Sequence, residues 1–226
     1  MKRRSKRYRE AVKILDKNRK YSLEEAVSLL KKMPASKFDA SLDLHFYLNI
    51  DPKKSDQLVR GTIILPHGTG KKKKIAVFCK GELENVARQA GADIVGAEDL
   101  INKVANGFME FDCVVATPDI MKDISRLGKI LGPRGLMPSP KAGTVTMDIK
   151  KAIDELRKGK IEFKTDKQSG IHVSVGKLSF DEDKLVENAR RVIEAVNEAK
   201  PASVKGKYIK SIYISSTMSP GIPLEC

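Results

Sequence analysis

The residues best placed to do chemistry in this sequence are cations set among glycines and prolines. The stretch 128–145, GKILGPRGLMPSPKAGTV, holds three cations and four glycines and contains no acid. Pro133 suits the second position of a turn that Gly135 closes, so the stretch is predicted to be an ordered loop. A phosphate-binding surface would have this composition, and so would an ordinary long loop of an α/β domain. Arg134 and Lys141 are its candidates for secondary basic contacts.

Two further segments add to the positive charge. Residues 57–81 contain six cations and no acid, and residues 1–20 carry ten cations against two acids. The whole chain has a formal net charge of +14 at pH 7. Clustered cations bind phosphates without reading a base sequence, so this distribution predicts a polyanionic partner. The alternative is a charged tail that serves only solubility.

The usual constellations of an enzyme or a metal site do not stand out. GTGKKKK at 68–74 lacks the spacer and the Ser or Thr of a Walker loop, and FCKGELE at 78–84 has one glycine where a dinucleotide fingerprint needs three. His45, His67 and His172 stand apart in the sequence and are interpreted as surface histidines. We therefore predict no catalytic residue, no metal ligand and no cofactor.

Cysteine usage and hydropathy indicate the compartment. The three cysteines, at 79, 113 and 226, are odd in number and far apart, which favours a reducing cytoplasmic setting over a disulfide framework or a zinc site. No apolar run approaches the roughly 18 residues that a membrane helix needs. The basic N-terminus is not followed by an apolar segment, so it is not interpreted as a signal peptide.

Hydrophobic periodicity predicts the elements that position these groups. Residues 42–50, LDLHFYLNI, alternate strictly between apolar and polar, which is typical of a half-buried strand. Ser22 with Glu25, and Ser179 with Glu182, have the spacing of capping boxes and predict two helix starts. The other strands and helices expected in the two flanks of the chain cover 26–33, 59–65, 161–163, 171–175, 185–196 and 209–215.

The centre of the chain has a different hydrophobic pattern. Short apolar strands alternate there with amphipathic helices, which is typical of βαβ units and a parallel sheet covered on both faces. Thr117 and Pro118 are expected to cap and open one of these helices. The strands are expected at 74–79, 92–95 and 113–116, and the helices at 82–90, 98–106, 118–131 and 149–156.

The chain is therefore predicted to be split, in the α/β fold class. Residues 1–67 and 160–226 would form one discontinuous α+β domain with an antiparallel sheet, because neither flank has enough strands for a stable sheet alone. Residues 68–159 would be an inserted Rossmann-like parallel α/β domain. Glycine tolerates large backbone changes, so the glycines at the two crossings are the expected hinge: Gly68, Gly70 and Gly159.

Several stretches resemble one known family. LPHGTGK (65–71), AVFCKG (76–81) and LGKILGPRGLMPSPKAGTV (127–145) look like signatures of bacterial large-subunit ribosomal protein one, the L1-stalk ribosomal protein family. STMSPG at 216–221 resembles the closing motif of that family. Ser219 departs from it, because the family commonly has glycine there, and a side chain at 219 is expected to shift the backbone next to the RNA. The tail also ends early, in LEC.

The resemblance implies a structural protein of the large-subunit stalk and not an enzyme. It implies binding to large-subunit ribosomal RNA through the split domain, assistance to release of deacylated exit-site tRNA, and repression of translation of its own operon mRNA. The protein would be a cytoplasmic component of the ribosome and a monomer off it, with no cofactor and no membrane partner. By motif match, the RNA-contacting candidates are Lys37, Phe38, Asp166, Lys167, Ser169, Gly170, Ser211, Thr217 and Met218.

Two other classes of function are weighed against this one. A nucleotide-dependent enzyme could use the parallel-sheet insert, and saturable ATP or NAD binding would favour it. A hinged small-ligand binding protein would close around a solute and would show no strong salt dependence of RNA affinity. Aromatic residues make up only 5% of the chain, so stacking of bases on an aromatic platform is not expected to be the main mode of binding.

Overall fold

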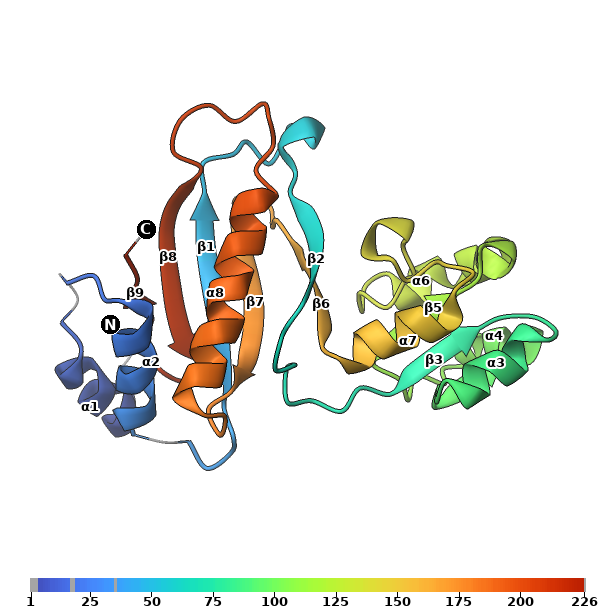
Figure 1. Ribbon diagram of the computed structural model, residues 1–226, viewed down its shortest axis with the longest axis horizontal. Coiled ribbons are helices and arrows are strands. Elements are labelled where there is room, and N and C mark those ends of the chain that lie inside the picture. The colour runs from blue at the N-terminus through green and yellow to red at the C-terminus, as the bar shows by residue number, and fades with distance from the viewer. Residues whose placement is uncertain (1–3, 17–18, 35, 226) are drawn as a thin grey trace. The chain divides into compact units, whose positions relative to one another are not determined.

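The computed structural model describes residues 4–16, 19–34 and 36–225 (Figure 1). The chain divides into two compact units. One combines the described residues up to Gly70 with those from Ile161 onward, and the other spans Lys71–Lys160. Cys226 and five positions of the basic N-terminal segment lie outside the described residues.

The first unit contains a four-stranded antiparallel sheet in the order β7-β1-β8-β9. Strands β2 and β6 pair with each other in a separate two-stranded sheet. The strands are β1 (Ser41–Leu48), β2 (Arg60–Ile64), β6 (Lys160–Lys164), β7 (Gly170–Lys177), β8 (Ile209–Ser216) and β9 (Ile222–Pro223). The helices are α1 (Lys6–Ile14), α2 (Leu23–Lys32) and α8 (Glu182–Glu198), with one 3₁₀ turn at Ser55–Gln57.

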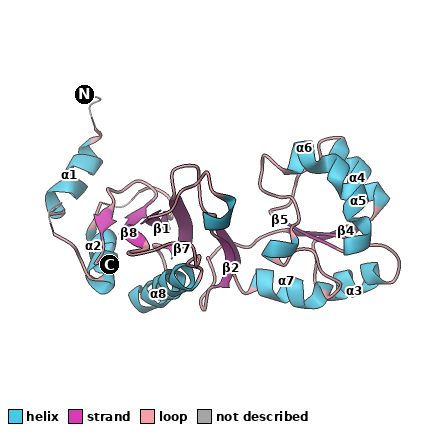
Figure 2. Cartoon of the chain, turned by 90° about the horizontal axis from the view of Figure 1, so that it is seen from above, coloured by secondary structure: helices cyan, strands magenta, loops and turns pink. Residues whose placement is uncertain are grey.

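The predicted alternation along β1 builds the core of this unit. Leu42, Leu44, Phe46 and Leu48 are buried, and the residues between them are not. The buried side packs against the apolar faces of α2 and α8, in one continuous hydrophobic cluster. Seen from above, α8 runs along one face of the sheet and no described helix lies over the opposite face (Figure 2). That opposite face is therefore open in the described part of the chain.

The second unit has a parallel sheet in the order β4-β3-β5, with helices on both faces. Helices α3 and α7 bury their apolar residues on one face, and α4 with the segment 120–131 does so on the other. The strands are β3 (Ile75–Phe78), β4 (Ile94–Gly96) and β5 (Cys113–Ala116). The helices are α3 (Leu83–Gln89), α4 (Glu98–Ala105), α5 (Met121–Ile124), α6 (Gly128–Leu131) and α7 (Ile149–Arg157). The predicted mixed fold class is thus confirmed, because an antiparallel sheet with helices and a distinct parallel sheet with helices occur in one chain.

The helix predicted for 118–131 is not continuous. It consists of 3₁₀ turns at Pro118–Ile120 and Ser125–Leu127 alternating with α5 and α6. The Ser125 hydroxyl donates to the carbonyl of Met121 at 2.7 Å, a back-bond that bends helices. Thr117 precedes the first turn but makes no side-chain cap. Because α6 starts at Gly128, the first residues of the stretch predicted as a loop are helical.

The two predicted capping boxes also differ from the structure. Ser22 Oγ accepts from the Glu25 backbone N–H at 3.2 Å, as predicted, but the Glu25 carboxylate pairs with Arg19 at 2.8 Å instead of closing the box. The N-cap of α8 has no side-chain hydrogen bond. Ser179 instead donates its backbone N–H and its hydroxyl to the carboxylate of Asp39, at 3.2 and 2.8 Å. A charged acceptor outcompetes the backbone groups of the helix.

Candidate nucleic-acid interface

The sheet face opposite α8 is polar. Asp43, His45 and Tyr47 of β1 point to this face, because they alternate with the buried residues of the strand. Register places serines, a histidine and a tyrosine of the neighbouring strands beside them. Ser174 and Ser215 flank Asp43, His172 and Tyr213 flank His45, and Gly170 and Ser211 flank Tyr47. Hydroxyls, imidazoles and two partly exposed aromatic rings therefore share one surface.

One end of this face carries an apolar pair and a free cation. Phe38 and Met218 are each 53% exposed, which is unusual for such large apolar side chains. Lys37 is exposed beside Phe38. Thr217 Oγ1 accepts from the Ser41 backbone N–H at 3.0 Å and donates to the Ser41 carbonyl at 3.3 Å. Thr217 thus fixes the end of β1 while its exposed side stays available.

Ser219 closes the turn that presents Met218. Its hydroxyl accepts from the Ser216 backbone N–H at 2.9 Å and donates to the Pro220 carbonyl at 3.0 Å. The backbone at 219 does not have the positive φ that would require glycine. The serine therefore fits this turn without strain and supplies two hydrogen bonds that glycine could not.

The other end of the face is a turn organised by Asp166. One carboxylate oxygen of Asp166 accepts from the backbone N–H groups of Gln168 at 2.8 Å and Gly170 at 2.6 Å. These bonds, the one from Gly170 first, hold the pKa of the Asp166 carboxyl below its ordinary value. Asp166 therefore shapes the turn, and the neighbouring Lys167 is the exposed cation of this end.

Ser169 is the strained residue of that turn. Its φ is +65°, and it is the non-glycine residue with a positive φ among those the structure describes. The side chain is buried, and its hydroxyl donates to the carbonyl of Ile50 at 2.9 Å. Left-handed backbone at a residue with a Cβ costs about 1–2 kcal/mol, so the hydrogen bond offsets part of this strain.

The predicted contact residues thus fall into two clusters at opposite ends of the sheet. Cluster A holds Lys37, Phe38, Thr217 and Met218, and cluster B holds Asp166, Lys167, Ser169, Gly170 and Ser211. The six residue steps from Ser41 to Tyr47 along β1 separate the clusters by about 20 Å, at roughly 3.3 Å per residue. Sequence reasoning missed the residues between them. Strict alternation in 42–50 placed His45 and Tyr47 on the polar side, but it could not show which side chains of other strands would join them.

His45 and His172 lie on the exposed polar face, as predicted, but they are not separate. Their Nδ1 atoms lie 2.9 Å apart, and their ring centroids are 5.1 Å apart in an edge-to-face arrangement. His45 Nε2 lies 2.9 Å from Ser215 Oγ, and His172 Nε2 lies 3.5 Å from an Asp166 carboxylate oxygen. A chain of polar groups therefore crosses three strands and ends at cluster B. His67 is separate and contacts Glu187 at 2.6 Å.

Burial and the neighbouring imidazole both act on His45. Desolvation is the larger cause and the charge of His172 the next, and together they hold the pKa of His45 below its ordinary value of 6.5, against an opposing effect of Asp43. The Asp166 carboxylate faces His172 Nε2 at 3.5 Å. One Nδ1 atom of the pair must donate and the other accept, and when His45 donates at Nδ1 its Nε2 accepts from the Ser215 hydroxyl. One arrangement of protons satisfies the whole chain.

The basic stretch of the second unit is ordered. Its turn is closed by the Gly135 N–H donating to the Gly132 carbonyl at 3.0 Å, and Gly135 has a φ of +69°. Val145 forms a parallel bridge with Ala116, which attaches the end of the stretch to β5. Arg134 and Lys141 are exposed on it. They belong to a different unit from clusters A and B.

The three glycines of the predicted hinge share a backbone conformation. Gly68, Gly70 and Gly159 have φ values of +64°, +72° and +95°, which favour glycine. The division between the two units falls after Gly70 and after Lys160, next to these residues. The hinge itself stays a prediction.

The described residues contain no group of three or more histidine, cysteine, aspartate or glutamate side chains that could hold a metal ion. None of the described helices is long and apolar enough to cross a membrane. Burial raises the pKa of the Cys79 thiol to about 11, so this cysteine stays protonated near neutral pH.

Comparison with known proteins shows the family. The model of the ribosomal protein L1p/L10e family matches residues 30–220. A large ribosomal subunit protein uL1 of Bifidobacterium longum subsp. infantis is 54% identical over 225 residues, covering 100% of this chain and 98% of that protein. The proteins of the same name from Bifidobacterium animalis subsp. lactis and Persephonella marina are 54% identical over 221 residues and 52% identical over 229. The alignments cover 98% and 100% of this chain, and 96% and 95% of those proteins, respectively.

Proposed function

Because this chain belongs to the ribosomal protein L1p/L10e family, and is a structural protein of the large ribosomal subunit and not an enzyme, we propose that it binds large-subunit ribosomal RNA through the open face of its four-stranded sheet. The nucleotide-dependent enzyme is thereby set aside. The observation that carries the proposal is the exposure of Phe38 and Met218 beside Lys37, at the end of a face that no described helix covers.

The chemistry of the face suits RNA. Exposed lysines at both ends bind phosphates, which contributes affinity without base specificity. Between them, the hydroxyls of Ser211, Ser215 and Ser174 and the imidazoles of the histidine pair can exchange hydrogen bonds with 2′-hydroxyls and base edges. A rigid sheet fixes the two clusters about 20 Å apart, so it selects RNA whose backbone has a matching shape.

The second unit is assigned a subsidiary contact. Arg134 and Lys141 lie exposed on an ordered, acid-free stretch, which is suited to a passing phosphate backbone such as that of exit-site tRNA. Flexing at Gly68, Gly70 and Gly159 would let this unit move while the first unit stays on the ribosomal RNA. We propose that this motion assists release of deacylated tRNA.

The same face would serve in regulation. An operon mRNA that presents the shape of the ribosomal site would bind the free protein, a monomer in the cytoplasm, and block translation of its own message. Ribosomal RNA would compete for the same surface, so repression would begin only when free protein is in excess.

The test is a footprint of the full chain on large-subunit ribosomal RNA. Binding should protect one compact region, and protection should be lost on replacing Phe38 and Met218 with alanine. Protection that persists in this variant, and is lost instead on replacing Arg134 and Lys141 with glutamine, would assign the interface to the second unit.

A further inference from the structure

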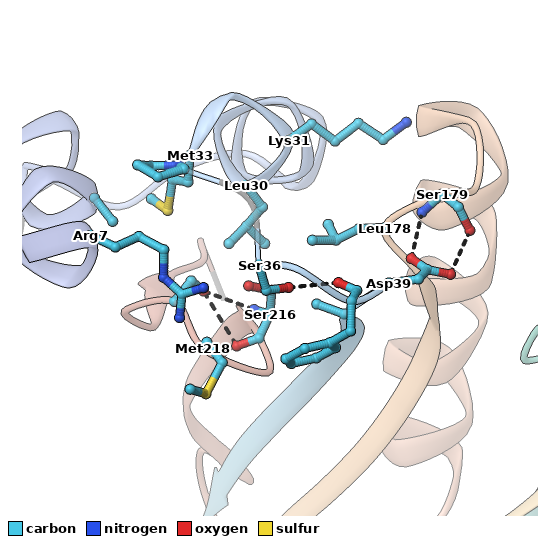
Figure 3. A pocket seen from close by; sticks show the side chains of 15 residues that line it. Arg7, Leu30, Lys31, Met33, Ser36, Asp39, Leu178, Ser179, Ser216 and Met218 are labelled. Atoms are coloured by element: carbon cyan, nitrogen blue, oxygen red, sulfur yellow. Dashed lines mark hydrogen bonds between the residues drawn. The ribbon is translucent and has the colours of Figure 1, made fainter. Parts of the chain in front are cut away.

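A cavity of about 450 Å³ opens beside cluster A (Figure 3). It lies among α1, α2, the segment 36–40 and the turn after β8. Its floor consists of buried apolar side chains, Ala11, Leu30 and Met33, with the half-buried Leu178 beside them. The volume falls within the range of small-molecule sites, and it exceeds the size of one nucleobase.

A cation without a partner stands at this cavity. Arg7 of α1 lines it, and the guanidinium makes no hydrogen bond, ion pair or ring contact with any described residue. The one carboxylate of the lining, Asp39, accepts from the backbone N–H and the hydroxyl of Ser179. Lys31 is also in the lining, and its charge adds to that of Lys184, whose hydrogen bond is the main cause that lowers the pKa of the Asp181 carboxyl. Arg7 is therefore a cation of the cavity that can bind an anionic group of a ligand.

The rim of the cavity is shared with the proposed RNA surface. Phe38 and Met218, the exposed apolar pair of cluster A, both line it. In Figure 3, the Arg7 side chain extends toward Met218, and Leu30 enters the cavity from α2. RNA held on cluster A would thus pass directly over the opening.

We propose that this cavity binds one unpaired nucleotide of the RNA, with its base on the apolar floor and a phosphate on Arg7. The inference rests on the proposed function. It adds a pocket that reads a splayed-out base, whereas the sheet face reads backbone and shape. The apolar floor suits the flat face of an aromatic base, the hydroxyls of Ser36 and Ser219 in the lining can bond its polar edge, and the guanidinium forms a charge-assisted pair with the phosphate. A peptide segment would leave backbone polar groups unpaired on this floor.

The direct test is a methyl NMR titration of the full chain with adenosine 5′-monophosphate. Saturable shifts of the Leu30, Met33 and Leu178 methyls are expected, with a dissociation constant on the order of 1 mM. The Leu58 methyls, which lie exposed elsewhere in the same unit, should not shift. Ribose 5-phosphate should shift these methyls far less, since it lacks the base. Equal shifts with both compounds, or none with either, would overturn the proposal.

Arg7→Gln and Arg9→Gln form a matched pair on α1. Both remove one charge from the same helix, and Arg9 does not line the cavity. Arg7→Gln should weaken the nucleotide about tenfold, because a charge-assisted phosphate bond is lost, and Arg9→Gln should not. If both variants bind the nucleotide equally weakly, the positive charge of α1 as a whole attracts it, and Arg7 has no specific contact with its phosphate.

Ribosomal RNA affinity, measured in the same variants, separates this inference from the proposed function. The wild-type chain could bind ribosomal RNA without binding adenosine 5′-monophosphate, and Arg7→Gln could leave its RNA affinity unchanged. That result would refute the nucleotide pocket and leave the proposed sheet interface standing. If the wild-type chain does not bind ribosomal RNA, the interface fails, whatever the pocket does.

Discussion

The Nδ1 atoms of His45 and His172 lie 2.9 Å apart across the pairing of β1 with β7. The two residues are 127 positions apart in the chain, and strand register alone brings them together. A hydrogen bond between two imidazole Nδ1 atoms needs one donor and one acceptor, so the pair can hold one extra proton but not two without breaking. A second proton would also place two positive charges at this distance.

Protonation of this pair should make folding stability depend on pH. The pKa of His45 is lowered in the folded chain, so the unfolded chain binds the proton more tightly. The contribution to stability is therefore complete above the ordinary value of 6.5 and is lost as the pH falls below it. Urea unfolding at several pH values between 5 and 8 should show a smaller decline for His45→Gln than for wild type. An equal decline in His45→Gln and in wild type would contradict this prediction.

The exposed ring of Phe38 should matter for RNA and not for folding. Phe38→Ala should weaken ribosomal RNA binding by about 1–3 kcal/mol, as expected for loss of an aromatic contact to a nucleotide. Stability should change by no more than about 0.5 kcal/mol, because the side chain is exposed. Leu58→Ala, which removes another exposed apolar side chain of the first unit, should leave affinity unchanged. Equal losses for both variants would remove Phe38 from the interface.

The hydroxyl of Thr217 should contribute to both fold and binding. Thr217→Val removes the acceptor of the Ser41 N–H and should destabilise the chain by about 1 kcal/mol. If RNA also bonds to this hydroxyl, affinity should fall by about 1–3 kcal/mol. Thr217→Ser keeps the hydroxyl and should retain both properties. RNA affinity that is the same in Thr217→Val as in wild type would limit this residue to a structural role.

Salt dependence should distinguish the two basic surfaces. The logarithm of the RNA association constant should fall steeply with the logarithm of salt concentration, and Lys37→Gln and Lys167→Gln should each reduce the slope by about 1. Arg134→Gln and Lys141→Gln should have smaller effects on ribosomal RNA, since they lie in the second unit. The reverse order of effects would contradict the assignment of the main interface to the sheet.

The buried hydroxyl of Tyr208 should cost stability. It has no hydrogen-bond partner among the described residues, and burial raises the pKa of the phenol to about 12. Tyr208→Phe should raise the free energy of unfolding, by up to about 1 kcal/mol, because an unsatisfied polar group is removed at constant shape. Chemical denaturation would measure this, and a loss of stability would mean that the hydroxyl is bonded in solution.

Local patterns in the sequence were enough for the secondary elements and the fold class. Strict alternation over 42–50 predicts β1 and its buried side, because a strand turns successive side chains to opposite faces whatever the rest of the chain does. Apolar strands alternating with helices predict the parallel sheet of the centre for a similar reason. The same reasoning failed for the capping box predicted at Ser179. The hydrogen bonds of Ser179 go instead to Asp39, which lies in a distant part of the sequence.

The composition of the chain by itself determined a basic protein, since charge is a sum over residues and needs no fold, and it favoured a polyanionic partner. Which residues meet was decided only by the tertiary structure. Strand register joins His45 to His172, the turn after β8 brings Met218 beside Phe38, and α1 places Arg7 at a cavity that α2 also lines. These contacts depend on relative positions of elements far apart in sequence, and those positions follow from burial of a shared core, which no single stretch of residues encodes.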